Sequence, residues 1–359
     1  KHYLESLNTK IIAITGSNGK TTTKDIVTSI LETKFKVHKT QGNFNNELGV
    51  PLTILAAPED SDILVLEMGA DNFGQLDFLS KLVKPDYTII TNIGESHIEF
   101  FGSRVGIAKA KFEITNGMKK DGFFVYNGDE PLLKELVENS SINATSCGEN
   151  SYNDIILENY TITRNEIDFK LNIDENNFST TLKGKHNLFN IMFAVAIAKK
   201  IGLANEEIRY AIDNISKITN MRLESIPYAE ASLIINDAYN ASPTSMKAAV
   251  DVISDLNDFE FKTLVLGSMF ELGSNEVEYH SGVGTYINNN SRGINLVISV
   301  GALAKNITDN INNKDINTLH FSTIEEVTDY LKANKHKNEV ILFKASRSMK
   351  LETIINNIK

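Results

Sequence analysis

The string TGSNGKTT at residues 15–22 follows an apolar, β-branched run. In such a glycine-rich turn, backbone N–H groups and the first turn of the next helix point at bound phosphates. Lys20 adds a charge for the β- and γ-phosphates, and the Thr21 hydroxyl is suited to hold Mg²⁺. The strict pattern has glycine where Ile14 stands, so Gly16 supplies the flexible backbone. The string predicts a variant phosphate loop that binds ATP or GTP through Gly16, Ser17, Asn18, Gly19, Lys20, Thr21 and Thr22.

Two further candidate side chains follow strand-like runs later in the chain. Glu67 directly follows the apolar run ILVL at residues 63–66. A carboxylate at a strand's carboxyl end beside a phosphate loop can hold Mg²⁺ directly or through water. The alternative is a carboxylate that caps the next helix. His97 lies past a third strand in the string NIGESHIEFFG, and this position favours a functional role over the structural role of most isolated histidines.

The string AKAKFEI at residues 108–114 places two lysines on an expected helix. Lys109 and Lys111 are about 200° apart around the helix axis, so they lie on different faces. If one faces solvent, the other faces the site, where it pairs with phosphate or with a substrate carboxylate. Two solvated lysines are the alternative, and without further information this alternative is the favoured one.

Asparagines are frequent in the string QGNFNNELGVP at residues 41–51. Asn43, Asn45 and Asn46 are suited to recognition of a polar substrate through their amide groups, and equally to plain turn formation. Both interpretations stay open at this point.

Four weaker candidates lie in the second half of the chain. Asp237 follows a strand-like string, where a carboxylate hydrogen-bonds ribose hydroxyls or caps a helix. Arg222 lies in a polar stretch between the two halves, from which it could reach a γ-phosphate across a cleft. Lys344 and Arg347, in the string KASR after the last expected strand, offer two cations for an anionic group.

The elements that position these residues alternate between strand and helix, which predicts βαβ units and a parallel sheet covered on both faces. Ligands of such folds bind at the carboxyl ends of the strands, where the motifs above lie. Residues 155–182 instead alternate polar and apolar side chains around a turn at 174–177, which predicts an antiparallel appendage. The expected strands are Lys10–Thr15, Ile63–Glu67 and Tyr87–Asn92, and the expected helices are Thr21–Thr33, Phe73–Leu82 and Asn187–Ile201.

A second βα series begins at Ala231 and predicts a smaller, Rossmann-like α/β domain without a phosphate loop. The polar stretch Lys217–Arg222 is expected to link the domains, which we place at residues 1–218 and 219–359. The expected strands are Leu233–Asp237, Thr263–Gly267, Leu296–Val300, Thr318–Phe321 and Val340–Phe343, and the expected helices are Pro243–Asp255, Val277–Asn290, Ile324–Lys332 and Lys350–Ile358.

Composition narrows the class of protein. The 359 residues suffice for two or three domains, and the net charge of −10 argues against nucleic acid as the main partner. The single cysteine, Cys147, excludes an intramolecular disulfide and a cysteine-based zinc site, which fits a reducing cytoplasm. No apolar run approaches the ~18 residues of a membrane helix, so we expect a cytoplasmic protein without membrane insertion.

Taken together, these strings resemble the Mur ligase superfamily. The phosphate loop, the string EMGA, the string NIGESHIEFFGS and the string GKHNLFNIMFA occur in the family's order. NFNNELGVPLT, DAYNASPTSMKAAV, LGSMFELG and KASRSMKLE look like the member that adds D-Ala-D-Ala to UDP-N-acetylmuramoyl-tripeptide in peptidoglycan precursor synthesis. The resemblance extends from Lys10 to Glu352.

The resemblance implies an ATP- and Mg²⁺-dependent amide ligation by a monomer. The tripeptide carboxylate attacks the γ-phosphate of ATP, and the amine of D-Ala-D-Ala displaces phosphate from the resulting acyl phosphate. A kinase or GTPase is the rival among phosphate-loop enzymes, and a nucleotide-binding scaffold without catalysis is the rival from another class.

The resemblance also implies roles for particular residues. Lys20, Glu67, His97 and a carbamylated Lys111 would be catalytic, and the last three with Thr21 would be metal ligands; this choice favours Lys111 over Lys109. The remaining nucleotide contacts would be Asn187, Asn190, Arg222 and Asp237, and the substrate contacts would be Asn43, Asn45, Asn46, Tyr239, Asn240, Lys344, Ser346 and Arg347.

Two departures from the family pattern bear on function. Ser268 stands where the family usually has an acidic residue, so a role for that position stays open. The family carries an N-terminal domain that grips the uridine end of the substrate, and this chain starts just before its first core strand. We therefore expect that the chain binds nucleotide without that domain and has weak affinity for the UDP-sugar substrate. Whether the chain catalyses ligation alone stays open.

Overall fold

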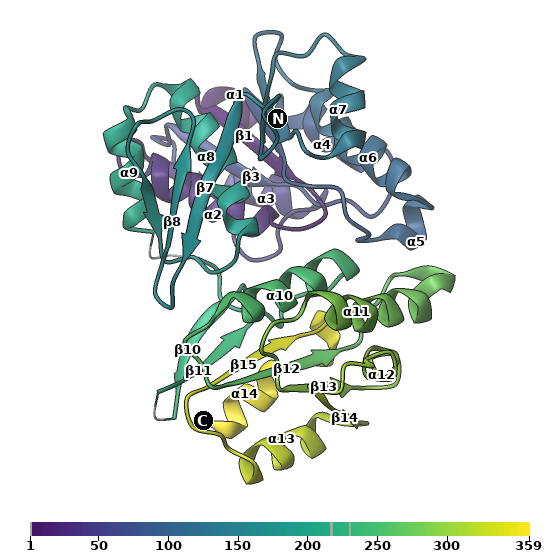
Figure 1. The fold of residues 1–359 in the computed structure, drawn as a ribbon. Helices are drawn as coiled ribbons and strands as arrows, with labels where there is room; N and C mark the ends of the chain where they lie inside the picture. Colours follow the sequence, from purple (N-terminus) through teal and green to yellow (C-terminus); the bar gives the residue numbers. More distant parts are fainter. Residues whose placement is uncertain (1, 216–217, 230) are drawn as a thin grey trace. The chain divides into compact units, whose positions relative to one another are not determined.

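The computed structural model describes residues 2–215, 218–229 and 231–359, which form two compact units. The first unit comprises residues 1–161, 166–181 and 185–219, and the second comprises 162–165, 182–184 and 220–359. Lys217, the first residue of the expected linker, lies outside the described residues. Each unit is built around its own sheet (Figure 1).

The first unit contains a nine-stranded sheet in the order β2-β3-β1-β4-β5-β6-β7-β8-β9. β1 pairs in parallel with β3 and with β4, so the carboxyl ends of these three strands lie at one edge of the sheet. β8 and β9 pair antiparallel around the expected turn, which confirms the mostly parallel sheet with an antiparallel appendage. The strands are β1 (Lys10–Thr15), β2 (Val37–Lys39), β3 (Ile63–Glu67), β4 (Tyr87–Ile90), β5 (Phe123–Asn127), β6 (Ala144–Gly148), β7 (Ile155–Ile162), β8 (Ile167–Leu171) and β9 (Phe178–Thr180).

Helices cover both faces of this sheet. Residues of α3, α4, α6 and α7 pack in one apolar cluster with Ala13, Leu64 and Leu66 of the strands. Ile12 and Ile14 alternate with Ala13 and are equally buried, so they face the opposite layer, where α2 and α8 lie side by side. The helices are α1 (His2–Ser6), α2 (Lys20–Leu31), α3 (Gly49–Leu55), α4 (Gln75–Val83), α5 (Ile98–Phe101), α6 (Arg104–Phe112), α7 (Pro131–Glu138), α8 (His186–Ile201) and α9 (Asn205–Asp213).

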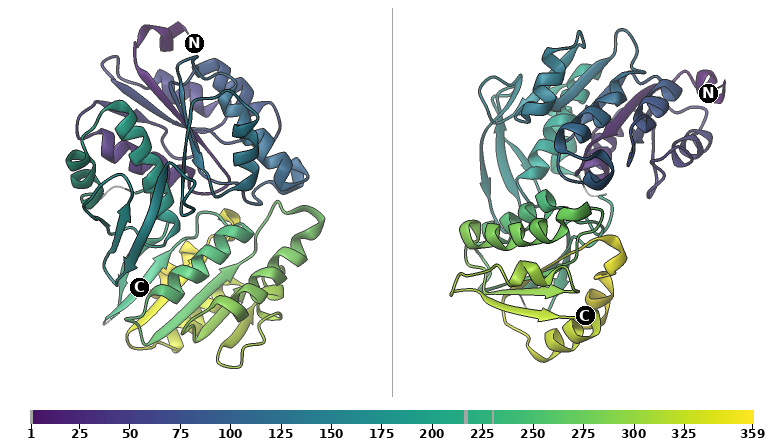
Figure 2. Two further views of the ribbon diagram at one scale, coloured as in Figure 1. Left: turned by 45° about the horizontal axis from the view of Figure 1, so that its top comes forward. Right: turned by 90° about the vertical axis from the view of Figure 1, so that its right-hand side faces the viewer.

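The second unit contains a six-stranded sheet in the order β10-β11-β15-β12-β13-β14. The strands from β11 to β14 in this order run parallel to one another, as expected. β10, at the edge, pairs antiparallel with β11. α10 and α11 lie on one face, and α13 and α14 pack on the other (Figure 2). The elements are β10 (Glu224–Tyr228), β11 (Ser232–Asn236), α10 (Pro243–Asp255), β12 (Phe261–Gly267), α11 (Glu276–Asn290), β13 (Leu296–Val300), α12 (Lys305–Thr308), β14 (Asn317–Phe321), α13 (Ile324–Ala333), β15 (Glu339–Lys344) and α14 (Glu352–Ile358).

Several expected boundaries shift by one or two residues. β4 ends at Ile90 rather than at Asn92, and the side chains of the next two residues, Thr91 and Asn92, bond the phosphate loop. α14 starts at Glu352 rather than at Lys350, whose φ of +52° ends a short 3₁₀ turn. No helix within the described ranges has the length and apolar character that a membrane crossing requires.

Candidate active site

The phosphate loop, residues 16–19, connects β1 to α2 and is pinned to the end of β4. The Thr91 hydroxyl donates to the Asn18 carbonyl (2.5 Å), and the Asn18 N–H donates to the Asn92 side chain (2.9 Å). Gly16 has a φ of +146°, and a Cβ at this position would lie 1.9 Å from Thr91 Oγ1. The close approach to β4 therefore requires glycine where the strict pattern would have other residues.

Lys20 and the hydroxyl groups around it suit an anionic ligand. The Lys20 ammonium folds back onto the loop and donates to the Gly16 carbonyl (2.7 Å) and the Ser17 carbonyl (3.4 Å). The Thr15 and Ser17 hydroxyls are buried, and no hydrogen-bond partner for either is found among residues 2–215, 218–229 and 231–359. Buried hydroxyls without partners cost free energy, and phosphate oxygens would relieve that cost.

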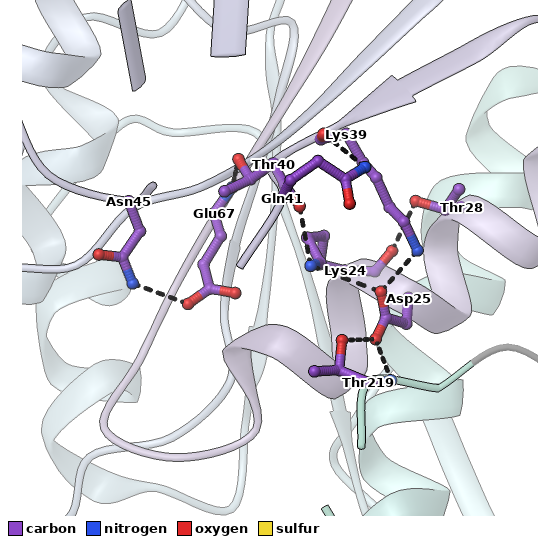
Figure 3. A network of polar contacts seen from close by, with 9 residues as sticks. All are labelled: Lys24, Asp25, Thr28, Lys39, Thr40, Gln41, Asn45, Glu67 and Thr219. Carbon is purple, nitrogen blue, oxygen red and sulfur yellow. Dashed lines mark hydrogen bonds and ion pairs between the residues drawn. The ribbon is translucent and has the colours of Figure 1, made fainter. Parts of the chain in front are cut away.

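Glu67 ends β3 directly beside β1, because Ile14 and Glu67 are register partners. Its side chain is buried, and Oε1 accepts a hydrogen bond from Asn45 Nδ2 (2.9 Å; Figure 3). Within the part of the chain that the structure describes, Oε2 has no hydrogen-bond partner. A buried carboxylate oxygen without a donor fits a hard cation such as Mg²⁺. Glu67 does not cap the following helix, because Gly74 occupies that position at α4 and its N–H bonds Glu113.

The two lysines of α6 differ in environment. Lys109 is exposed, whereas the side chain of Lys111 is 1% exposed and donates to the Ala70 carbonyl (3.1 Å). No ion pair joins Lys111 to a carboxylate of the described residues. Burial, with the positive charge of Lys20, lowers the pKa of Lys111 to about 7, against the opposing effect of Asp71 and Glu113. A large fraction of its amine is therefore uncharged near neutral pH.

His97 lies between β4 and α5, half-buried and with a φ of +60°. The adjacent Ser96 hydroxyl donates to the Ser17 carbonyl (3.3 Å), so the loop that carries His97 contacts the phosphate loop. The structure thus gathers the loops of Lys20, Glu67 and His97 at one edge of the sheet. No group of three or more His, Cys, Asp and Glu side chains able to hold a metal is found among the described residues.

Asn187 and Asn190 are buried on α8, beside the phosphate-loop helix. Asn190 Nδ2 donates to Asn187 Oδ1 (2.8 Å), and Asn190 Oδ1 accepts from the Thr23 hydroxyl of α2 (3.1 Å). A Cβ on Gly19 would lie 2.8 Å from the same Asn190 oxygen. Asn190 therefore holds α8 against the start of α2 in this structure.

The side chains of the asparagine-rich loop make different contacts. Asn45 bonds Glu67, as described above, whereas Asn46 Oδ1 accepts from the N–H groups of Leu48 (3.2 Å) and Gly49 (2.9 Å) at the start of α3. Asn46 thus performs turn chemistry, and Asn43 is exposed.

In the second unit, most of the predicted residues meet at the carboxyl ends of β11 and β15. Lys344 Nζ donates to Asp237 Oδ2 (2.6 Å) and to the Asn240 carbonyl (3.0 Å). The Arg222 guanidinium lies 4.1 Å from the centroid of the Tyr239 ring. Lys344 is therefore already neutralised by Asp237, which the spacing in the sequence did not indicate.

Ser346 and Arg347 lie slightly apart from this group. The Ser346 hydroxyl accepts from the Phe270 N–H (3.1 Å), which joins it to the string LGSMFELG. Arg347 is exposed and pairs with Glu352. Sequence reasoning missed Thr91 and Asn92, which pin the phosphate loop; the polar pair TN directly after an apolar run was the available signal.

Comparisons with known proteins identify the family of the chain. The chain matches the Mur ligase middle domain over residues 14–198 and the Mur ligase, glutamate ligase domain over residues 221–347. The UDP-N-acetylmuramoyl-tripeptide–D-alanyl-D-alanine ligase of Bacillus subtilis (strain 168) is 44% identical over 366 residues, which cover 100% of this chain and 78% of the relative.

Two solved structures share the fold across almost the whole chain. MurF from Acinetobacter baumannii superposes with a TM-score of 0.89 at 29% identity, covering 99% of this chain and 78% of that one. The MurF ligase from Thermotoga maritima, solved in complex with ADP, gives a TM-score of 0.87 at 28% identity, covering 99% and 81%. The chain belongs to the Mur ligase family and, within it, to the UDP-N-acetylmuramoyl-tripeptide–D-alanyl-D-alanine ligases.

Proposed function

We propose that this protein joins D-Ala-D-Ala to UDP-N-acetylmuramoyl-tripeptide in the cytoplasm, with hydrolysis of ATP to ADP and phosphate. The observation that carries the proposal is Lys111, a buried lysine without an acidic partner among the described residues, on a helix beside a phosphate loop. A simple phosphate-binding protein has no need of such a costly group.

The first step of the reaction turns a poor electrophile into a good one. The terminal carboxylate of the tripeptide attacks the γ-phosphorus, and ADP leaves, so that the carboxyl carbon now carries phosphate as a leaving group. Lys20, which lies against the phosphate loop, and the N–H groups at the start of α2 would bind the phosphates and align them for this transfer. The amine of the dipeptide then attacks the carboxyl carbon, loses a proton and expels phosphate.

The residues present suit Mg²⁺. Thr21 would hold the ion that accompanies the nucleotide, and Glu67, His97 and Lys111 would serve a second one. Bound Mg²⁺ supplies positive charge for the oxygens of the transferred phosphate. The orphaned oxygen of Glu67 is the feature of this structure that fits the ion.

Lys111 would serve this site as a carbamate. Its uncharged amine attacks carbon dioxide, one proton is released, and the side chain changes from a cation to an anion. Burial favours this route because it lowers the pKa of Lys111 to about 7 and so exposes the nucleophilic lone pair. The resulting carboxylate oxygens would replace the missing acidic partner.

The second unit would contribute contacts to nucleotide and substrate. Arg222 and Asp237 are proposed to contact phosphate and ribose, and the neighbouring strings are proposed to face the peptides. The structure supports a shared role for Arg222, Asp237, Tyr239, Asn240 and Lys344 because they gather at one sheet edge.

Product analysis tests the proposal against a kinase. With ATP, the UDP-tripeptide and D-Ala-D-Ala, we expect equal amounts of ADP, phosphate and pentapeptide product, and no steady release of phosphate when either peptide is left out. A phosphorylated end product would show phosphate transfer to a final acceptor instead. Turnover of ATP that ignores both peptides would contradict ligation as well.

A further inference from the structure

The loop after β12, residues 268–272, is held from two sides within the second unit. The Met269 N–H donates to His280 Nε2 of α11 (2.9 Å). The next N–H, of Phe270, donates to the Ser346 hydroxyl (3.1 Å), and the Ser346 N–H donates back to the Ser268 carbonyl (3.1 Å). His280 and Ser346 of the string KASR thus accept hydrogen bonds from two consecutive N–H groups of this loop, those of Met269 and Phe270.

The contacts of His280 define its protonation state. His280 is fully buried, and its Nδ1 lies 2.6 Å from the Glu276 carbonyl oxygen, which can only accept a hydrogen bond. Nδ1 therefore carries the proton. Nε2 faces an N–H group and must offer its lone pair, so the imidazole is neutral. Burial also lowers the pKa of His280, against the opposing effect of Glu276, and this keeps the ring neutral.

The loop is packed tightly against the string that follows β15. β12 and β15 are neighbouring parallel strands, and a Cβ on Gly267 would lie 2.6 Å from the Ala345 Cβ. Met269 and Ala345 are completely buried. A displacement of the Met269 backbone would therefore be transmitted to Ser346 through the two hydrogen bonds that join the strings.

We propose that His280 is a positioning residue for ligation, which fixes the loop 268–272 and, through it, the substrate-facing string 344–347. The inference rests on the proposed function, because that function assigns Lys344, Ser346 and Arg347 to the substrate. His280 would act by accepting the hydrogen bond of the Met269 N–H, whose loss leaves a buried polar group unsatisfied.

Two substitutions distinguish the bond between His280 and the Met269 N–H from the bond between His280 and the Glu276 carbonyl. The side-chain oxygen of H280Q extends to the position of Nε2 and can accept from Met269. The side chain of H280N matches Nδ1, so it can donate to Glu276 but cannot reach Met269. We expect H280Q to retain near wild-type KM for both peptides, whereas H280N raises the KM of at least one peptide about tenfold, with an unchanged KM for ATP.

Two measurements test the inference independently of activity. Long-range ¹H–¹⁵N correlation spectra should show the proton of His280 on Nδ1, and hydrogen exchange at Met269 and Phe270 should be faster in H280N than in H280Q. A proton on Nε2, or equal exchange and equal KM values in the two variants, would overturn it. If the wild-type protein does not ligate, the proposed function fails, while the spectra and exchange rates still decide whether His280 clasps the loop.

Discussion

A single lysine shows most clearly how environment sets chemistry in this protein. Lys111 and Lys109 have the same intrinsic chemistry and lie two residues apart, yet one is buried and the other exposed. Helical spacing predicted that they face different ways, but not which one faces inward. That choice depends on the packing of α6 against the sheet, where Ala108 and Ala110 are also buried.

Replacement of Lys111 tests the carbamate. We expect K111A to reduce kcat at least a hundredfold, about the loss of ~3 kcal/mol seen when one electrostatic group is removed from an active site. Small carboxylates such as acetate or formate should restore part of the rate, because they return an anion to the vacated space. The matched control is K109A on the exposed face, which should keep its activity.

Restoration of the K111A rate by small carboxylates is the decisive result, because they would not restore the activity of a misfolded protein. Full activity in K111A, or inactivity that no carboxylate relieves in a folded protein, would contradict an anionic role for this side chain.

At the level of elements, a buried polar network ties the phosphate-loop helix to neighbouring segments of the first unit (Figure 3). Asp25 of α2 accepts from Lys39 Nζ (2.7 Å) and from the Thr219 N–H and hydroxyl (2.9 and 2.7 Å). Lys24 donates to the Thr40 carbonyl (2.9 Å), and the Thr40 hydroxyl accepts from the Glu67 N–H (3.0 Å). The network fixes α2 relative to the strand end that carries Glu67.

Removal of the Asp25 charge is expected to destabilise the first unit. D25N leaves Lys24 and Lys39 beside a neutral amide, and breaking such a buried pair from one side costs about 3 kcal/mol of unfolding free energy. Urea unfolding followed by a probe in the first unit measures this. D60N, at an exposed ion pair with Lys36, is the control and should change stability by less than about 0.5 kcal/mol.

The same residue predicts a pH dependence. Burial alone would raise the pKa of Asp25, but Lys24, Lys39 and the bond from Thr219 lower it below its ordinary value of 3.8. A carboxyl group whose pKa is lowered by folding gives its full stabilisation at pH values above its pKa in the unfolded chain. This stabilisation is lost as the pH falls through its pKa in the folded protein. The stability gap between wild type and D25N should therefore narrow below about pH 4; a gap that stays constant down to pH 2 would contradict the assignment.

The elements also show what sequence could predict. Hydrophobic period and turn residues predicted β1, β3 and β4 of the first sheet and β12, β13 and β15 of the second, because these strands are buried on both faces. β5, which is also buried, and its neighbour β6 were not predicted. β10 was missed because it is an edge strand with exposed alternate residues and Pro227 within it. The pair of Asp237 and Lys344 joins residues 107 positions apart, and only the adjacency of β11 and β15 brings them together.

At the scale of the whole molecule, the sign of the net charge does not match the charge of the proposed ligands. The chain has 46 acidic and 36 basic residues, giving a net charge of −10, yet the proposed substrates are anionic. Lys20 supplies a local positive charge in the site, close enough to Lys111 to lower the pKa of that side chain. The net charge thus argued against nucleic acid as the main partner but said nothing of the nucleotide and peptide ligands.

The central claim is that ATP activates a carboxylate by forming an acyl phosphate, and oxygen transfer tests it most directly. The UDP-tripeptide is prepared with ¹⁸O in its terminal carboxylate and incubated with the protein, ATP, Mg²⁺ and D-Ala-D-Ala. If the carboxylate attacks the γ-phosphorus, one ¹⁸O atom bridges to phosphorus and leaves with it, so each phosphate released carries one ¹⁸O. Phosphate free of ¹⁸O, released while pentapeptide accumulates, would contradict the account.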